Sequence, residues 1–310
     1  MRACILISRA GSDYPKSGVS AELSVRRRSL RRSVKHFVTI AHSAARAAAY
    51  ARGMNPLKAS AALWFIVAAA GQWLFAYYVV VVFGVRVAAD GLAGLSQVRL
   101  MHGYVVGDTI GNVASTVHIL LAIAIHGGGP LQLFPWIRNH APTFHRWNGR
   151  AFLVAAIVST LFGLYLQWIR DATQGPADTG GNTVASILIL IFAALALRAA
   201  RARNFDAHRR WALRLFLVVS AVWFIRLGSY GSQFLERAFA VRFAPAYYES
   251  LNAAKLVVPL GLLELYFWAQ RGADARGRTA VATAIVAATV LTAVGIYGAA
   301  TIKWLPAVRR

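Results

Sequence analysis

Two short basic motifs hold the residue types in this chain that are best suited to chemistry. The first runs from His145 to Leu153 as HRWNGRAFL, and the second runs from His208 to Leu217 as HRRWALRLFL. Aligned on their tryptophans, both read Trp-x-x-Arg-x-Phe-Leu after a His-Arg pair. Guanidinium groups bind carboxylates and phosphates, and an imidazole exchanges protons or ligates a metal near neutral pH. The candidate ligand or proton site therefore includes His145, Arg146, Arg150, His208, Arg209 and Arg214.

Glu264 is a further candidate because it is an acid in the middle of an apolar run. A charge in hydrocarbon is costly unless it is paired. Glu264 precedes Gln270 by six residues, which is ~9 Å of helix and matches the expected depth of the motif arginines. We predict an ion pair between Glu264 and Arg214 or Arg150. A structural role and a functional role for that pair are equally open. Lys255 falls on the opposite face of the same helix, so it is not the partner.

His118 is the deepest ionisable residue of the candidate set. Small residues at a spacing of four, Gly103, Gly107, Gly111 and Ser115, precede it. Such a strip lets another helix approach closely, and His118 falls ~20° from Gly111 around the helix axis. The pattern predicts that His118 faces the packed interior. It would either form a hydrogen bond between helices or belong to a proton-relay site.

The elements that position these residues are membrane-spanning helices. The chain is 58% hydrophobic, yet its net charge is +23. A bilayer protein can spread this much apolar material over lipid-facing helices. Seven segments reach the ~20 apolar residues needed to cross the hydrocarbon core. They are about 60–83, 104–126, 150–169, 183–200, 211–228, 251–270 and 280–303. The predicted fold is an all-α membrane bundle over residues 59–310.

The distribution of basic residues predicts the orientation. With the N-terminus inside, the inner loops hold 12 Lys/Arg and the outer segments hold eight. Basic loops stay in the cytoplasm, so the N-terminus is predicted inside and the C-terminus outside a bacterial inner membrane. Residues 1–58 form a separate basic arm with 12 Lys/Arg and two acids. The arm is a helix on the membrane surface, a disordered tail, or an extension upstream of a start at Met54.

The two motifs also indicate an internal repeat. Trp147 and Trp211 are 64 residues apart, the length of a two-helix hairpin, and an Arg-Asn pair precedes each motif. We predict that residues 104–169 superpose on about 168–228 by a rotation about the membrane normal.

Together these residues resemble a known family. The chain is similar to the bacterial membrane family called domain of unknown function 2306, DUF2306. The resemblance is carried by both motifs and by Gly129-Pro130-Leu131-Gln132, Ile137-Arg138, Pro142, Asn252 and Glu264-Leu265-Tyr266. The resemblance covers roughly residues 104–268, while Ala212 replaces a frequent Met and the basic arm is not part of the pattern. It implies a polytopic membrane protein without an assigned activity.

The sequence leaves three functions open. It contains a single cysteine, Cys4, and no P-loop, dinucleotide, nucleophile-elbow or zincin motif, so most soluble-enzyme chemistry is unsupported and whether the protein is an enzyme stays open. Membrane lipids are the expected partners, and nucleic acid is not, because no reading module is present. The first function is binding of an anionic lipid or small ligand near the cytoplasmic face, or proton relay. The second is a b-type haem redox protein with His145 and His208 as ligands. Their place at the helix mouths counts against it. The third is a structural or assembly role.

Overall fold

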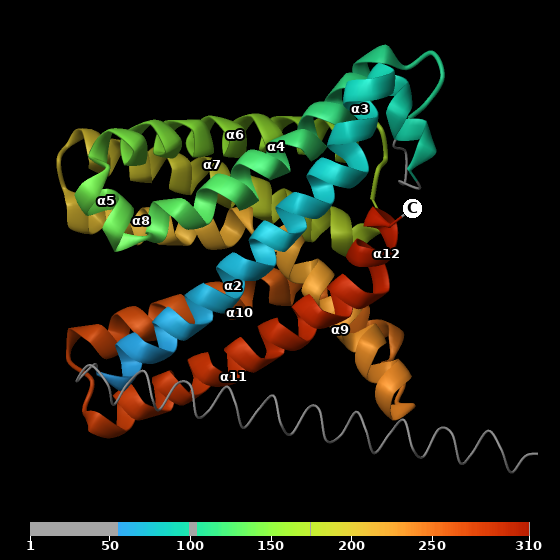
Figure 1. Cartoon of the computed structure of the whole chain (residues 1–310). Helices are drawn as coiled ribbons and strands as arrows, with labels where there is room; N and C mark the ends of the chain where they lie inside the picture. The colour runs from blue at the N-terminus through green and yellow to red at the C-terminus, as the bar shows by residue number, and fades with distance from the viewer. Residues whose placement is uncertain (1–54, 99–103, 174, 310) are drawn as a thin grey trace, which may run out of the picture.

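The computed structural model describes residues 55–98, 104–173 and 175–309, and all regular secondary structure in these ranges is helical (Figure 1). The chain starts with α2 (Pro56–Val79), η1 (Val80–Gly84), α3 (Val85–Asp90) and η2 (Gly91–Gln97). It continues with α4 (Thr109–Leu133), α5 (Pro135–His140), α6 (Pro142–Trp168), α7 (Pro176–Arg201), α8 (Phe205–Val219) and α9 (Ala221–Phe239). The last elements are α10 (Pro245–Arg271), α11 (Ala275–Ala299), η3 (Ala300–Trp304) and α12 (Leu305–Val308).

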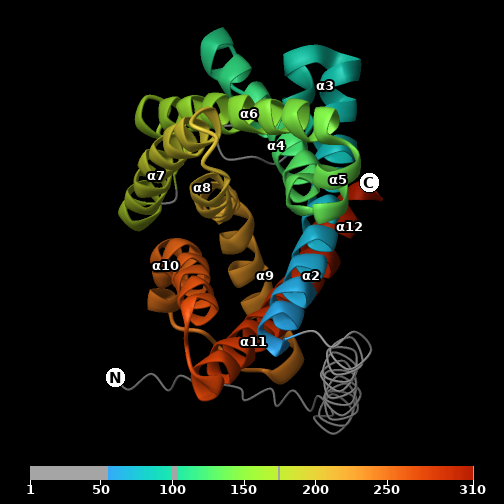
Figure 2. The same ribbon diagram turned by 90° about the vertical axis from the view of Figure 1, so that its left-hand side faces the viewer.

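Within the described residues, six helices are long and apolar enough to cross a membrane. Helices α8 and α9 meet at a bend of 46°, and they count as a seventh span if the two together cross the membrane once. The predicted all-α membrane fold is therefore confirmed. Successive spans run in alternating directions, so alternate helix ends gather at one end of the bundle (Figure 1). This end contains α5, the first turns of α2, α6, α8 and α11, and the last turns of α7 and α10. We call this the basic end, and Figure 2 looks onto it.

The second span differs from its prediction of 104–126. Helix α4 begins at Thr109 because the Asp108 side chain caps it, accepting a hydrogen bond from the Gly111 amide at 2.8 Å. Gly107 therefore lies in a turn with φ of +84°, and Gly103 lies outside the described residues. Of the three described residues of the predicted strip of small residues, Gly111 and Ser115 are on the helix and Gly107 is not.

At its other end, α4 continues through Gly127-Gly128-Gly129-Pro130, which the predicted span excluded. A proline inside a helix leaves a carbonyl without its usual partner. Here side chains of neighbouring helices donate hydrogen bonds to carbonyls in the turn before Pro130. Trp73 Nε1 donates to the Gly127 carbonyl at 3.1 Å, and Asn148 Nδ2 donates to the Gly128 carbonyl at 2.9 Å. Tertiary contacts therefore preserve a helix that local sequence would end.

The fifth predicted span, 211–228, is divided at Ser220. The Ser220 hydroxyl donates to the Phe216 carbonyl at 2.8 Å and accepts from Gln72 Nε2 at 3.0 Å. A serine that bonds back to the carbonyl four residues earlier bends a helix. The bend lies next to the largest buried cluster, which includes Phe75, Tyr78, Trp223 and Trp304.

The two motif copies have the same local geometry. In each copy the arginine stacks on the tryptophan three residues earlier, with Arg150 4.8 Å from the Trp147 ring centroid and Arg214 4.6 Å from that of Trp211. Both copies open a helix at the basic end, and α4 packs on α6 as α7 packs on α8. Superposition of the whole hairpins stays a prediction.

Candidate functional site

The first motif copy lies where the end of α4 meets the start of α6, and several of its polar groups have no partner. His145 is half-buried, and its Nδ1 has no hydrogen-bond partner among the described residues. The same is true of Gln132 Nε2 on α4. Within the described ranges, the hydrogen-bond partner of Arg146 is the Thr143 hydroxyl, at 3.3 Å. Arg150 is exposed and stacks on Trp147. The first copy therefore has two exposed arginines, while one buried nitrogen each of His145 and Gln132 lacks a partner among the described residues.

Gln132 lies close to the backbone of α6. A Cβ at Gly149 would lie 3.2 Å from Gln132 Oε1, so the glycine allows the close approach of this amide. In the second copy the residue 64 positions after Gln132 is Ala196, which brings no amide. The sequence analysis did not select Gln132 as a site residue, although it had quoted this residue for the family resemblance.

The second motif copy has its polar groups satisfied. His208 Nδ1 lies 2.9 Å from the Ala196 carbonyl oxygen, and Asn204 caps α8 by accepting from the Ala207 amide at 3.0 Å. Arg214 donates through Nε to Glu264 Oε1 at 2.7 Å, and its second terminal nitrogen lies 2.7 Å from the same oxygen. Arg209, the other predicted member, is exposed at the start of α8.

The predicted pairing of Glu264 is thus confirmed for Arg214. Arg150 takes no part in it within the described residues. The pair is less buried than a charge pair inside hydrocarbon was expected to be, since the Glu264 side chain is 47% exposed and that of Arg214 is 18% exposed. Arg214 also lies 5.4 Å from the Phe267 ring centroid, so aromatic faces cover the guanidinium while the carboxylate stays open.

The excess positive charge of the described residues gathers at one end of the bundle. The basic end holds 13 Lys/Arg and three acids, whereas six of the nine described acids lie toward the other end. The basic residues at this end are Lys58, Arg138, Arg146, Arg150, Arg198, Arg201, Arg203, Arg209, Arg210, Arg214, Arg271, Arg276 and Arg278. The acids there are Asp206, Glu264 and Asp274. This end attracts anions over its whole surface.

His118 packs between helices as predicted. Its Nδ1 lies 2.8 Å from the Ser159 carbonyl oxygen and 3.2 Å from the Ser159 hydroxyl. Gly163 allows this approach, because a Cβ there would lie 3.1 Å from His118 Cε1. His118 therefore joins α4 to α6, remote from the two motifs.

Arg170 is an important residue that the sequence analysis treated only as a loop charge. Its side chain is 7% exposed, and its Nε lies 3.0 Å from Asp108 Oδ2. Its terminal nitrogens donate to the Gly111 carbonyl at 2.8 Å, to Ser115 Oγ at 2.7 Å and to Asn112 Oδ1 at 2.8 Å. These contacts explain why the second span tolerates its polar residues.

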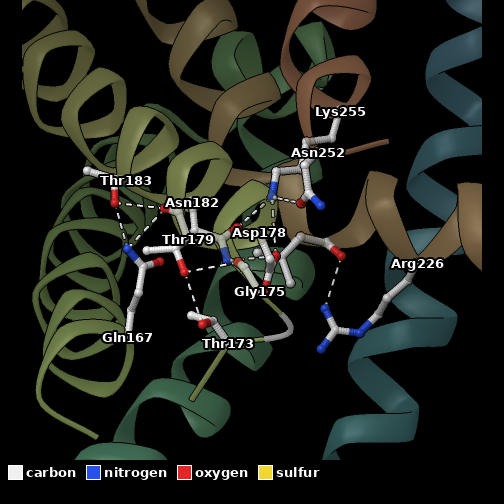
Figure 3. A network of polar contacts seen from close by, with 11 residues as sticks. Gln167, Thr173, Gly175, Asp178, Thr179, Asn182, Thr183, Arg226, Asn252 and Lys255 are labelled. Carbon is white, nitrogen blue, oxygen red and sulfur yellow. Dashed lines mark hydrogen bonds and ion pairs between the residues drawn. The ribbon is translucent and has the colours of Figure 1, made fainter. Parts of the chain in front are cut away.

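A second buried network joins α6, α7 and α10 toward the end opposite the basic end (Figure 3). Lys255, with a side chain 1% exposed, donates to Asn182 Oδ1 at 2.5 Å and to Asn252 Oδ1 at 3.0 Å, and its Nζ is 3.9 Å from Asp178 Oδ1. Gln167 donates to Thr183 Oγ1 at 2.6 Å. The prediction that Lys255 is not the partner of Glu264 is confirmed. The network around Lys255 was not predicted from the sequence.

A third polar cluster lies beside the bend between α8 and α9. Gln72 Oε1, His126 Nδ1 and Trp223 Nε1 are buried and have no hydrogen-bond partner among the described residues. The His126 ring centroid is 5.0 Å from that of Phe75, which also has the Arg226 guanidinium 5.4 Å from its centroid. Unpaired buried polar groups in a native fold indicate water or another ligand.

The haem hypothesis gains no direct support from the geometry. His145 lies at the start of α6 and His208 at the start of α8, both at the basic end. The described residues contain no cluster of three or more His, Cys, Asp or Glu that could hold a metal ion. A haem with two axial histidines does not need such a cluster, so this hypothesis stays a prediction.

Comparison with known proteins agrees with this description. No curated protein and no solved structure matches the chain. Residues 115–265 match a family model, and this region contains both motif copies, His118, Arg170, Lys255 and Glu264. The match confirms the resemblance found in the sequence: residues 115–265 are similar to the family described as Predicted membrane protein (DUF2306).

Proposed function

We propose that this membrane protein binds the headgroups of anionic lipids at its basic end, in the cytoplasmic leaflet of a bacterial inner membrane. The observation that carries the proposal is the segregation of charge, with 13 Lys/Arg against three acids at that end. The positive-inside rule places such an end in the cytoplasm. Each basic residue near an anionic surface contributes about 1 kcal/mol of attraction.

The exposed stacked arginine supports the same proposal. Tryptophan prefers the level of the headgroups in a bilayer. Because Arg150 stacks on the exposed Trp147, its guanidinium group is expected at the level of the lipid phosphates. A guanidinium at this level binds phosphate through two parallel hydrogen bonds.

The test is to reconstitute the full chain in nanodiscs of phosphatidylcholine with a minor fraction of phosphatidylglycerol, and to identify the retained lipids by native mass spectrometry. We expect phosphatidylglycerol to be enriched over its bulk fraction, and the enrichment to fall as salt screens the charges. Retained lipid that matches the bulk composition would refute the proposal.

Proton relay is a second candidate, and the unpaired atoms of Gln72, His126 and Trp223 favour it. These groups lie beside a bent span, where irregular backbone in membrane proteins commonly lines water. In proteoliposomes with an internal pH-sensitive dye, an imposed pH gradient should then dissipate faster than in protein-free vesicles, and His126→Gln should remove the difference. Equal rates with and without protein would exclude this candidate.

A further inference from the structure

We propose that a hollow between the end of α6 and the start of α7, at the end of the bundle opposite the basic end, binds the primary ammonium headgroup of a lipid. The hollow has a volume of about 670 Å³, and ligand pockets in proteins commonly have about 300–1,000 Å³. The residues that line it include Trp168, Asp171, Thr173, Thr179, Gly180 and Val184. The proposal does not depend on the anionic headgroups proposed for the basic end.

Asp171 provides an exposed carboxylate in this hollow. In the described ranges, none of the three ion pairs involves it. The preceding Arg170 is not available to it, because that side chain is 7% exposed and its Nε lies 3.0 Å from Asp108 Oδ2. Asp178 differs from Asp171, since it faces Lys255 Nζ at 3.9 Å. An accessible carboxylate without a counter-ion attracts a cation, because the new pair does not require breaking an existing one.

The polar wall of the hollow consists of threonines whose hydroxyl groups are oriented by the buried network of Figure 3. Gln167 Nε2 donates to Thr183 Oγ1 at 2.6 Å, and Thr179 Oγ1 donates to Thr173 Oγ1 at 3.0 Å. Gln167 itself is 7% exposed, so the network is anchored in the packed interior. A hydroxyl oxygen has two acceptor lone pairs, so Thr173 can accept a second hydrogen bond from a ligand in the hollow.

The apolar wall indicates that the ammonium belongs to a lipid. Trp168 is 62% exposed and Val184 is 50% exposed, and both line the hollow. Tryptophan prefers the level of the headgroups, and its ring face attracts a cation. Val184 lies eight residues after Pro176, which is ~12 Å along α7 toward the bilayer centre. The hollow therefore continues from a polar mouth to an apolar wall, as a headgroup continues into its acyl chain.

Gly180 leaves part of the hollow open. A Cβ at this position would meet no atom within 4 Å, so packing within the described chain does not require a glycine there. Glycine is less favourable than alanine inside a helix. A larger side chain at this position would enter the hollow that Gly180 lines. This makes it possible to fill the site without removing any charge.

The oxygen acceptors and the single ring decide between the two common ammonium headgroups. Quaternary ammonium groups are held in cages of several aromatic rings, whereas in the described residues Trp168 is the one aromatic side chain that lines the hollow. A primary ammonium has three N–H donors, which match the carboxylate of Asp171 and the hydroxyl of Thr173. The site therefore selects phosphatidylethanolamine over phosphatidylcholine.

The experiment is native mass spectrometry of the full chain in nanodiscs that contain equal amounts of phosphatidylethanolamine and phosphatidylcholine. Neither lipid has a net charge, so anionic-lipid binding at the basic end does not contribute. We expect phosphatidylethanolamine to be enriched among the retained lipids. Asp171→Asn should lower its affinity about tenfold, because a charge-assisted hydrogen bond is lost. Gly180→Leu should abolish the preference by filling the hollow.

Two matched controls separate the site from general effects. Glu249→Gln removes another exposed acid from the same end, and Gly261→Leu enlarges another helical glycine whose Cβ would meet open space. Both should change the affinity by about twofold or less. Thermal unfolding shows that each variant is folded, and Gly180→Leu should be at least as stable as the unmodified protein, since leucine favours a helix.

Three results would overturn the proposal: equal retention of both lipids by the unmodified protein, an equal loss in Asp171→Asn and Glu249→Gln, or an unchanged preference in folded Gly180→Leu. Titration with free ethanolamine in detergent tests the source of the ammonium. Ethanolamine should bind at least about tenfold more weakly than the lipid, because it lacks the apolar part. Equal affinity would overturn the lipid as the source. Each outcome is independent of phosphatidylglycerol, so a failure here is distinguishable from a failure of the basic-end proposal.

Discussion

Glu264→Gln tests whether the ion pair between α8 and α10 stabilises the fold. The substitution keeps the size of the side chain and removes its charge. In the native protein, Glu264 Oε1 receives both Nε and a terminal nitrogen of Arg214 at 2.7 Å. The variant leaves this guanidinium without a counter-ion while Trp211 and Phe267 still cover it, with ring centroids 4.6 Å and 5.4 Å away.

The expected magnitude follows from the exposure of the pair. An exposed ion pair in water contributes about 0–1 kcal/mol, and breaking a buried pair costs about 3–5 kcal/mol. The Arg214 side chain is 18% exposed and that of Glu264 is 47% exposed, so the pair falls between these limits. Glu264 also lies seven residues before the end of α10, ~10 Å along the helix, where the surroundings are partly hydrocarbon. We expect Glu264→Gln to lower the free energy of unfolding by ~2 kcal/mol.

The assay is reversible unfolding in mixed micelles with increasing dodecyl sulfate, followed by circular dichroism. The double variant with Arg214→Gln should cost less than the sum of the two single variants by at least ~1 kcal/mol, because the groups interact directly. Glu249→Gln is the matched control, since Glu249 is exposed and has no ion pair in the described structure. If Glu264→Gln behaves like this control, or if the two single changes are additive, the pair does not stabilise the fold.

Three further predictions follow from the structure. Arg170→Ala should lower the free energy of unfolding by at least ~3 kcal/mol because it strands the Asp108 carboxylate; a loss below ~1 kcal/mol in the same assay would show that the cluster is not important for stability. In a variant without Cys4, a cysteine at Ser250 should react with an impermeant maleimide in intact cells, while a cysteine at Thr143 should be protected, and the reverse pattern would invert the topology. Protein purified from haem-replete cells should show no Soret band, whereas a stoichiometric band that is lost when either motif histidine is replaced by alanine would establish haem binding.

The sequence determined the architecture because the bilayer imposes it. Hydrocarbon tolerates only helices and closed barrels, whose backbone groups are satisfied internally, so apolar runs of helical length located most spans. The repeated Trp-x-x-Arg-x-Phe-Leu pattern placed the two motifs at the same level of the bundle. Depth along a helix also follows from residue counting, which is why the Glu264 and Arg214 pair could be predicted.

Only the tertiary structure decided which polar groups meet across helices. Asp108 and Arg170 are 62 positions apart, and Asn182 and Lys255 are 73 positions apart, so no local periodicity indicates either contact. The continuation of α4 through Pro130 depends on donors from α2 and α6, and the bend at Ser220 is fixed by Gln72. The divergence of the two motifs is likewise invisible in their shared letters. It depends on residues outside the motif. Glu264 pairs with Arg214 and the Ala196 carbonyl contacts His208, whereas Arg150 and His145 Nδ1 have no such partners among the described residues.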